Sequence, residues 1–298
     1  MSPASTSFRS PAADRALFRA LAFSAGAVAA ILALILLYLT LASASLLFAD
    51  TGLWQLHWQP SAGAYGLVAM LLGSVAVSLL ALLIAVPPGL VLAVWGRFFA
   101  PPWVGGLYRG AMGLLASIPS VVYGFWGLVV LVPLLNRWAP PGASLLAAAL
   151  VLALMILPIL VLQADLALDE ARRRHLAAAM ALGASVSGTV RRVLLPTAAP
   201  QLLPAVLLQL GRALGETMAV LMVAGNVVQL PEAISAPIRT LTANIALEMA
   251  YASGAHRTAL FASGWLLFVL VTLIMLGARA MTRRLGEGYI GKGRGDAP

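Results

Sequence analysis

Long uncharged apolar runs alternate along the chain with short segments that hold most of the charged residues. No charged residue interrupts the first run, which lies between Arg19 and Asp50. A helix of about 20 apolar residues crosses the roughly 30 Å hydrocarbon core of a bilayer. This run exceeds the about 7–15 apolar residues of a cleavable signal sequence, so we interpret it as a retained span. The pattern predicts an all-α integral membrane protein with six spans, at residues 20–48, 65–95, 110–136, 143–164, 198–228 and 258–279.

The segments outside these runs complete the expected organisation. A transmembrane domain over residues 19–285 would include a loop at 165–197, with tails at 1–18 and 286–298. Strands of a membrane barrel would alternate polar and apolar residues over about ten positions, and the apolar runs here are continuous. Prolines inside the runs predict kinks or breaks in the spans; they are Pro87, Pro88, Pro119, Pro133 and Pro158.

Composition excludes several functional classes. Hydrophobic residues make up 61% of the chain and charged residues 10%, against roughly 25% charged residues in soluble domains. The chain has no cysteine, which excludes disulfides, zinc–thiolate sites and thiol catalysis. His57, His175 and His256 fall in separate loops without metal-ligand spacing. We therefore expect neither a metal site, nor a cofactor, nor a catalytic group.

The distribution of basic residues predicts the orientation. With the N-terminus inside, the inner segments hold most of the 19 Lys and Arg residues: Arg9, Arg15, Arg19, Arg97, Arg109, Arg172, Arg173, Arg174, Arg191, Arg192, Arg279, Arg283, Arg284, Lys292 and Arg294. The outer segments hold only Arg137, Arg239 and Arg257. Because cytoplasmic loops are enriched in Lys and Arg, both termini are expected to be cytoplasmic, in a plasma or bacterial inner membrane. The positive-inside rule also explains the net charge of +9 better than a nucleic-acid surface does.

The loop at 165–197 is too long for a simple connection between two spans. It is rich in alanine and leucine, which favours short helices, with breaks expected at Gly183 and Gly188. Such a helical hairpin would dock into a groove on a partner protein. Alternatively, its basic residues would anchor an interfacial helix to anionic lipid.

Arg212 and Glu216 interrupt the fifth apolar run. On a helix their i, i+4 spacing would place both side chains on one face. A lone arginine at the centre of a bilayer costs about 2.5–3.5 kcal/mol on insertion scales, so such residues face a bundle interior or an aqueous cavity. The planar guanidinium suits an oxyanion, and Glu216 would neutralise Arg212 while the site is empty. The alternative is a structural ion pair that joins two helices.

The loop resembles the permease subunits of binding-protein-dependent ABC importers (the MetI-like, type I family). That family's motif has Glu-Ala-Ala, three residues, Gly, and a later Leu-Pro. Alignment on Gly183 matches Ala178, Leu195 and Pro196, whereas Ala177 replaces the motif's glutamate. The resemblance implies a coupling helix that contacts a separate ATPase. This chain lacks a P-loop, since its only lysine, Lys292 in GKGRG, precedes neither Ser nor Thr.

Three further segments are similar to the C-type permease subunits of bacterial phosphate importers. They are LLASIPSVVYGFWGLVVLVP (114–133), GRALGETMAVLMVAGN (211–226) and TLTANIALEMAYASGAHRTALF (240–261). The likeness covers about residues 50–282. It implies that the substrate is phosphate and that Arg212 and Glu216 belong to the phosphate path. It also implies three partners: a second, A-type permease subunit, an ATP-binding subunit dimer and an extracytoplasmic binding protein.

Other polar residues in or near the spans are weaker candidates for the substrate path. Ser117, Ser120 and Tyr123 offer hydroxyl groups in the third span, although such groups also hold membrane helices together. Asn226 lies near the expected outer mouth. The outer segment 229–257 carries charges that would form either a docking surface for the binding protein or an ordinary solvated loop.

Alternative functions remain open from the residues themselves. A permease for sulfate or molybdate would have the same composition, and only the resemblance favours phosphate. A secondary transporter coupled to an ion gradient would be expected to show internal repeats, which the sequence does not display. A membrane-embedded structural or assembly protein would transport nothing.

Overall fold

The computed structural model describes residues 11–47 and 52–292. Within these ranges the chain is mostly helical, and it also contains loops and a short hairpin of β1 (Trp58–Gln59) and β2 (Ala64–Tyr65), in which Trp58 pairs with Tyr65. Residues 1–10 and 293–298 of the two predicted tails lie outside the described residues. The first helix already begins at Pro11 and the last extends to Lys292, so both helices enter segments that the sequence assigned to the tails.

Six membrane-spanning units are present in the described part of the chain. Five are helices long and apolar enough to cross a bilayer, and the sixth is a pair of helices separated by a sharp bend. The first, second, fourth and sixth units are α1 (Pro11–Leu47), α2 (Val68–Phe98), α6 (Leu145–Ala181) and α11 (Gly254–Lys292). The prediction of an all-α membrane protein with about six spans is confirmed.

The third span is broken at Pro119, one of the prolines at which the sequence predicted a kink or break, and it begins earlier than the predicted range of 110–136. Helix α3 (Pro102–Ser117) and the helical segment Ser120–Asn136 meet at 90°. That segment contains α4 (Ser120–Trp126), a π-helical stretch and α5 (Val132–Asn136). The break falls at Ile118 because Pro119 disfavours helical backbone in the preceding residue, and Ile118 is extended with ψ 129°.

The fifth span also differs from its predicted range of 198–228. A short helix α7 (Val186–Thr189), a π-helical turn and α8 (Leu195–Gly215) follow one another without interruption, so the span begins earlier than expected. It ends at Gly215, and the chain continues in the short helix α9 (Met218–Val223). The prolines Pro87, Pro88, Pro158, Pro200 and Pro204 lie inside continuous helices and do not break them.

Helix α6 forms the centre of the bundle. One face of it is buried from Leu145 to Ala171 and packs against α2, α3 and α8. Its N-terminal half joins α2, α8 and α9 in the largest apolar cluster, which includes Leu152, Met155 and Ile156. Helix α1 lies at the edge of the bundle and packs along α11, where Trp265 Nε1 donates to Thr40 Oγ1 at 3.0 Å.

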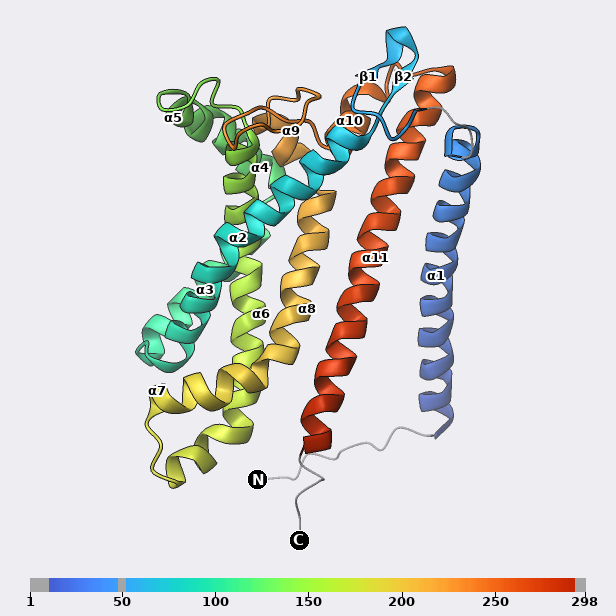
Figure 1. The fold of residues 1–298 in the computed structure, drawn as a ribbon. Coiled ribbons are helices and arrows are strands. Elements are labelled where there is room, and N and C mark those ends of the chain that lie inside the picture. Colours follow the sequence, from blue (N-terminus) through green and yellow to red (C-terminus); the bar gives the residue numbers. More distant parts are fainter. Residues whose placement is uncertain (1–10, 48–51, 293–298) are drawn as a thin grey trace.

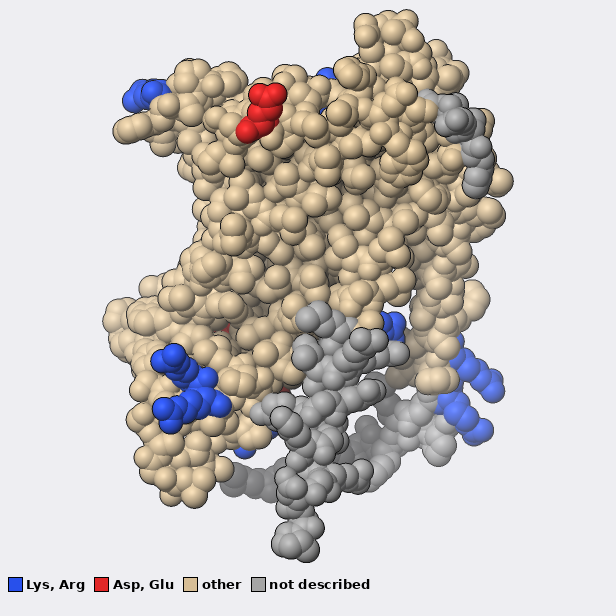
Figure 2. All heavy atoms as spheres, in the orientation of Figure 1, with Lys and Arg blue, Asp and Glu red and all other residues tan. Residues whose placement is uncertain are grey.

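Charge is distributed unevenly over the surface. Figure 2 shows basic side chains gathered at the lower end of one face and a broad uncharged band above them. In the same orientation, α1 begins and α11 ends at this lower end, and the turn between α6 and α7 lies there too (Figure 1). The opposite end carries the β hairpin, α5, α9 and α10 (Leu241–Glu248).

Candidate functional site

Arg212 lies one helical turn before the end of α8. Its side chain is exposed in the isolated chain, although it belongs to a membrane-spanning helix. Among the residues that the structure describes, no hydrogen bond or ion pair joins Arg212 to another side chain. A guanidinium group of this kind needs an anion, water or a partner chain to offset its cost in a membrane.

Glu216 does not share a helical face with Arg212, so the predicted i, i+4 helical pair is wrong. Helix α8 ends at Gly215, and Glu216 has an extended backbone with φ −69° and ψ 127°. Its carboxylate Oε1 instead accepts a 3.2 Å hydrogen bond from the backbone N–H of Ala219. The side chain thereby caps the first turn of α9, where backbone N–H groups lack helical partners.

A second contact, from α10, holds the break between α8 and α9. The hydroxyl of Thr242, in α10, donates a 3.0 Å hydrogen bond to the backbone carbonyl oxygen of Glu216. Thr242 Oγ1 also lies 3.0 Å from Thr240 Oγ1, and both side chains are buried. The contact from Thr242 satisfies the carbonyl oxygen of Glu216, which the interrupted helix would otherwise leave without a hydrogen bond.

The broken third and fifth spans pack against each other through α4 and α9. A Cβ atom on Gly124 would come within 2.7 Å of the Cα atom of Ala219, so only glycine permits this approach. Ser120 begins α4 and is partly exposed. The hydroxyl of Tyr123 donates to the carbonyl oxygen of Leu115 at 2.9 Å, across the bend between α3 and α4. Tyr123 therefore stabilises the bend. This agrees with the alternative that such hydroxyl groups hold membrane helices together.

Asn226 lies just beyond α9 in a left-handed conformation, with φ 56°. Its side-chain Nδ2 donates to the carbonyl oxygen of Leu221 at 2.7 Å, and its backbone carbonyl oxygen accepts from Arg239 Nε at 2.9 Å. Its side-chain oxygen is buried without a hydrogen-bond partner in the described part of the chain. No recorded hydrogen bond links Asn226 to Arg212 or Ser120 within the described residues, so the structure does not join all the predicted path residues in one network.

Arg239 and Glu248, at the same end of the molecule as α10, form an internal network. Glu248 Oε1 accepts from Arg239 Nη1 at 2.7 Å, and Glu248 Oε2 accepts from Trp58 Nε1 at 3.0 Å. His256 Nε2 lies 2.8 Å from the same Oε2 atom. Both Arg239 and Glu248 are largely buried, whereas Glu232 and Arg257 are exposed. Arg239 and Glu248 thus join the β hairpin, α10 and α11. Neither interpretation of the sequence, a docking surface for the binding protein or a solvated loop, predicted this internal role.

The predicted coupling residues surround the turn between α6 and α7. Ala177 and Ala178 are exposed near the end of α6, and Gly183 occupies the turn with φ +80°. Leu195 is partly buried against an apolar cluster that includes Leu168 and Leu194, whereas Pro196 is exposed. The chain therefore turns at Gly183 as expected, but Gly188 lies inside α7 and does not break it.

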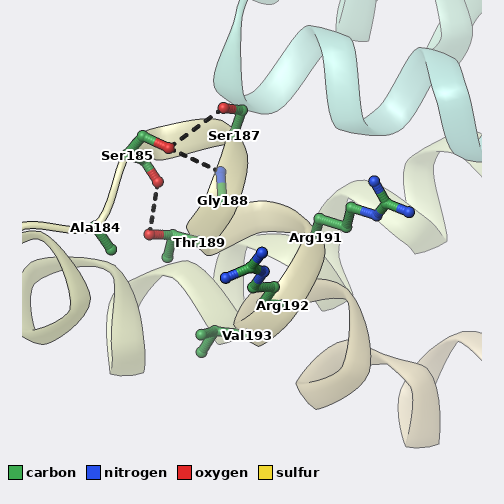
Figure 3. A pocket seen from close by; sticks show the side chains of 8 residues that line it. All are labelled: Ala184, Ser185, Ser187, Gly188, Thr189, Arg191, Arg192 and Val193. Carbon is green, nitrogen blue, oxygen red and sulfur yellow. Dashed lines mark hydrogen bonds between the residues drawn. The ribbon is translucent and has the colours of Figure 1, made fainter.

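A hollow of about 760 Å³ lies beside this turn (Figure 3). Ser185 caps α7, because its Oγ accepts from the N–H of Gly188 at 3.2 Å. Arg191 and Arg192 line the hollow on the following turn of the chain. Leu182, at the tip of the turn, is 89% exposed.

A largely buried ion-pair network joins α2 to α6 and was not anticipated from the sequence. Arg97 donates through Nε to Asp165 Oδ1 at 2.9 Å and through Nη1 to Asp169 Oδ1 at 2.8 Å. Asp169 also pairs with Arg172 and Arg173. The i, i+4 spacing of Asp165 and Asp169, which follow the apolar run of the fourth span, was the available signal.

In the described ranges, no group of three or more His, Cys, Asp or Glu side chains is arranged to hold a metal ion. Arg212 is one of the exposed charged groups that remain available to a ligand. A guanidinium group can bind and orient an oxyanion through parallel hydrogen bonds, without covalent chemistry.

Known proteins are similar to this chain in sequence and in fold. The chain is 34% identical over 261 residues to the "Phosphate transport system permease protein PstC" of Pasteurella multocida, covering 80% of this chain and 81% of that protein. It is 38% identical over 238 residues to the "Probable ABC transporter permease protein YqgH" of Bacillus subtilis, covering 78% and 77% of the two chains. A chain of the MetNI methionine ABC transporter, solved in inward-facing conformations, matches its fold with a TM-score of 0.60 at 23% identity, over 77% of this chain and 99% of that one.

Residues 85–287 match the family described as "Binding-protein-dependent transport system inner membrane component". The matched region runs from the middle of α2 into the last helix, so it includes both broken spans, Arg212 and the turn at Gly183. Because this match covers more than half of the chain, the protein belongs to the family of inner membrane components of binding-protein-dependent transport systems.

Proposed function

We propose that this chain is a permease subunit of an ATP-driven importer of inorganic phosphate. Arg212 is proposed to contact the anion transiently as it passes, and the subunit itself performs no covalent chemistry. The single observation that carries the proposal is an exposed arginine that has no ion-pair partner among the described residues, near the end of a membrane-spanning helix. The relatives named as phosphate transport permeases support the choice of phosphate among the oxyanions.

The exposure of Arg212 supports a path between two permease subunits. A cation on the outer surface of the assembled complex would face lipid, at a cost of several kcal/mol. The same side chain at a seam between subunits would face an aqueous route. The proposed complex therefore contains a second, A-type permease subunit, and this chain supplies one half of the path.

The remaining partners follow from the family and from the two ends of the molecule. We propose that both termini and the turn at Gly183 face the cytoplasm, in agreement with the basic residues at that end. Ala177, Ala178, Gly183 and the exposed Leu182 would then contact an ATP-binding subunit dimer. An extracytoplasmic binding protein would deliver phosphate to the opposite end, near α10 and the β hairpin.

Uptake of radiolabelled phosphate by vesicles that contain the complete importer tests this proposal. Arg212→Ala is expected to reduce ATP-dependent uptake at least about tenfold, because one charge-assisted contact to an anion contributes about 1.5–3 kcal/mol. Arg212→Lys is expected to recover only part of the activity, since an ammonium group lacks the planar fork. Arg279→Ala, at an exposed arginine of α11, serves as the matched control and should transport normally.

The outcomes separate the alternatives. Wild-type uptake by Arg212→Ala would remove the oxyanion role. Uptake that continues without ATP or the ATP-binding subunits would indicate a secondary transporter. Competition by sulfate or molybdate, stronger than that by unlabelled phosphate, would assign the permease to another oxyanion.

A further inference from the structure

The exposed face of α8 continues from Arg212 toward the inner end of the molecule. Gln201, Ala205, Leu208 and Arg212 follow one another at spacings of four, three and four residues. Because an α-helix has 3.6 residues per turn, these four side chains form one stripe. From Gln201 to Arg212 the stripe extends about 16 Å along the helix axis, at about 1.5 Å per residue.

A cavity of about 350 Å³, open along one side as a groove, lies along the inner part of this stripe, between α8 and α6. From α8 it is lined by the residues around Gln201 and Leu208, and from α6 by Gln163 and Leu166. The cavity has about ten times the roughly 30 Å³ share of one liquid water molecule. It is therefore large enough for a small anion together with some of its hydration water.

The two glutamines give this cavity hydrogen-bond donors without charge. Gln163 Oε1 accepts a 3.0 Å hydrogen bond from Nε2 of Gln209, which is buried in the core of the bundle. This contact fixes the amide of Gln163 and leaves its Nε2 group to donate. Gln201 is exposed on the opposite wall.

The acidic groups near this face are already compensated. Glu170 follows Gln163 on α6 by seven residues and pairs with Arg174 at 2.6 Å. Asp165 and Asp169 pair with Arg97 of α2. An anion in the cavity would therefore meet amide donors rather than uncompensated carboxylates.

We propose that this groove, formed by Gln163, Leu166, Gln201 and Leu208, is the inner half of the oxyanion route. The inference rests on the proposed function, because it takes Arg212 as the outer contact. Uncharged amides bind a tetrahedral oxyanion more weakly than a guanidinium group does. Passage requires binding that permits entry and still permits release, so neutral donors suit the segment that follows the arginine.

Cysteine accessibility tests whether the groove contains water. The chain has no cysteine, so a single substitution introduces the only thiol of this subunit. Leu208→Cys is expected to react with a charged, membrane-impermeant thiol reagent in inside-out vesicles that carry the complete importer. Leu34→Cys in α1 is the matched control, because Leu34 is 62% exposed and Leu208 52% exposed, but Leu34 would face lipid. Equal lack of reaction at both positions would overturn the proposal.

A charge at the same wall tests whether the groove conducts anions. Gln201→Glu keeps the shape of the side chain and adds a negative charge. Because like charges repel in a site of reduced dielectric, it should lower phosphate uptake at least about tenfold. Gln201→Leu, which adds no charge, should lower uptake much less. Wild-type uptake by Gln201→Glu would overturn the groove as a route. Arg212→Ala is measured in parallel. If Arg212→Ala is inactive while Gln201→Glu is normal, only the groove fails; if Arg212→Ala is normal, the proposed function fails as well.

Discussion

The hydroxyl group of Thr242 donates a 3.0 Å hydrogen bond to the backbone carbonyl oxygen of Glu216, 26 residues earlier in the chain. The bond joins α10 to the point where the fifth span breaks, four residues after Arg212. Because the N–H of Leu241 donates to Ser74 Oγ at 2.9 Å, α10 is itself fixed to α2. The position of the break is therefore determined by contacts from two other elements.

Replacement of Thr242 tests the first of these contacts. Thr242→Val keeps the shape of the side chain but leaves the carbonyl oxygen of Glu216 without its donor. An unsatisfied buried group of this kind costs about 1–3 kcal/mol, so the free energy of unfolding in mixed micelles should fall by that amount. Thr242→Ser should recover most of it. Thr258→Val, which removes a hydroxyl on the exposed side of α11, is the control and should change little. An equal loss in both valine variants would contradict this explanation.

The cap formed by Glu216 gives a second prediction. Glu216→Ala removes the acceptor for the N–H of Ala219 and should lower the free energy of unfolding by about 1–2 kcal/mol. Glu216→Gln should lose much less, because its amide oxygen accepts the same hydrogen bond. Reversible denaturant titration of the purified protein measures both values. If Gln and Ala destabilise the protein equally, the carboxylate acts through its charge and not as a cap.

The sequence predicted the number and type of the spans because a bilayer imposes a length and a polarity on each of them. It predicted a kink or break at Pro119, but it did not predict the break at Glu216. Pro119 signalled the first break, but Pro87, Pro88 and Pro158 carry the same signal and lie inside continuous helices. The break at Glu216 depends on Thr242, a residue 26 positions away, so local spacing alone favoured a helical pair with Arg212. The turn at Gly183 was predictable because its left-handed backbone requires a residue such as glycine.

That turn gives a third prediction. A Cβ atom on Gly183 would meet no atom within 4 Å, so the cost of Gly183→Ala comes from its φ of +80° alone. A left-handed conformation costs an alanine about 1–2 kcal/mol, and the stability of the protein should fall accordingly. Gly110→Ala in α3 is the matched control, because it also meets no atom within 4 Å but lies in a regular helix. It should leave stability unchanged or raise it by up to about 1 kcal/mol. A loss at Gly110 equal to that at Gly183 would contradict backbone strain as the cause.

The ion pair between Arg97 and Asp165 gives the last prediction. Only 4% of the Asp165 side chain is exposed, so Arg97→Met would leave a buried carboxylate without its principal partner. Removal of one member of a buried ion pair typically costs about 3–5 kcal/mol, whereas replacing both members with apolar residues is often neutral. The double variant Arg97→Met with Asp165→Leu should therefore be more stable than Arg97→Met alone, since Asp169 retains Arg172 and Arg173. Thermal unfolding of the single and double variants measures the difference. If the double variant is the less stable of the two, the network holds α2 against α6 through its charges, and apolar packing cannot replace it.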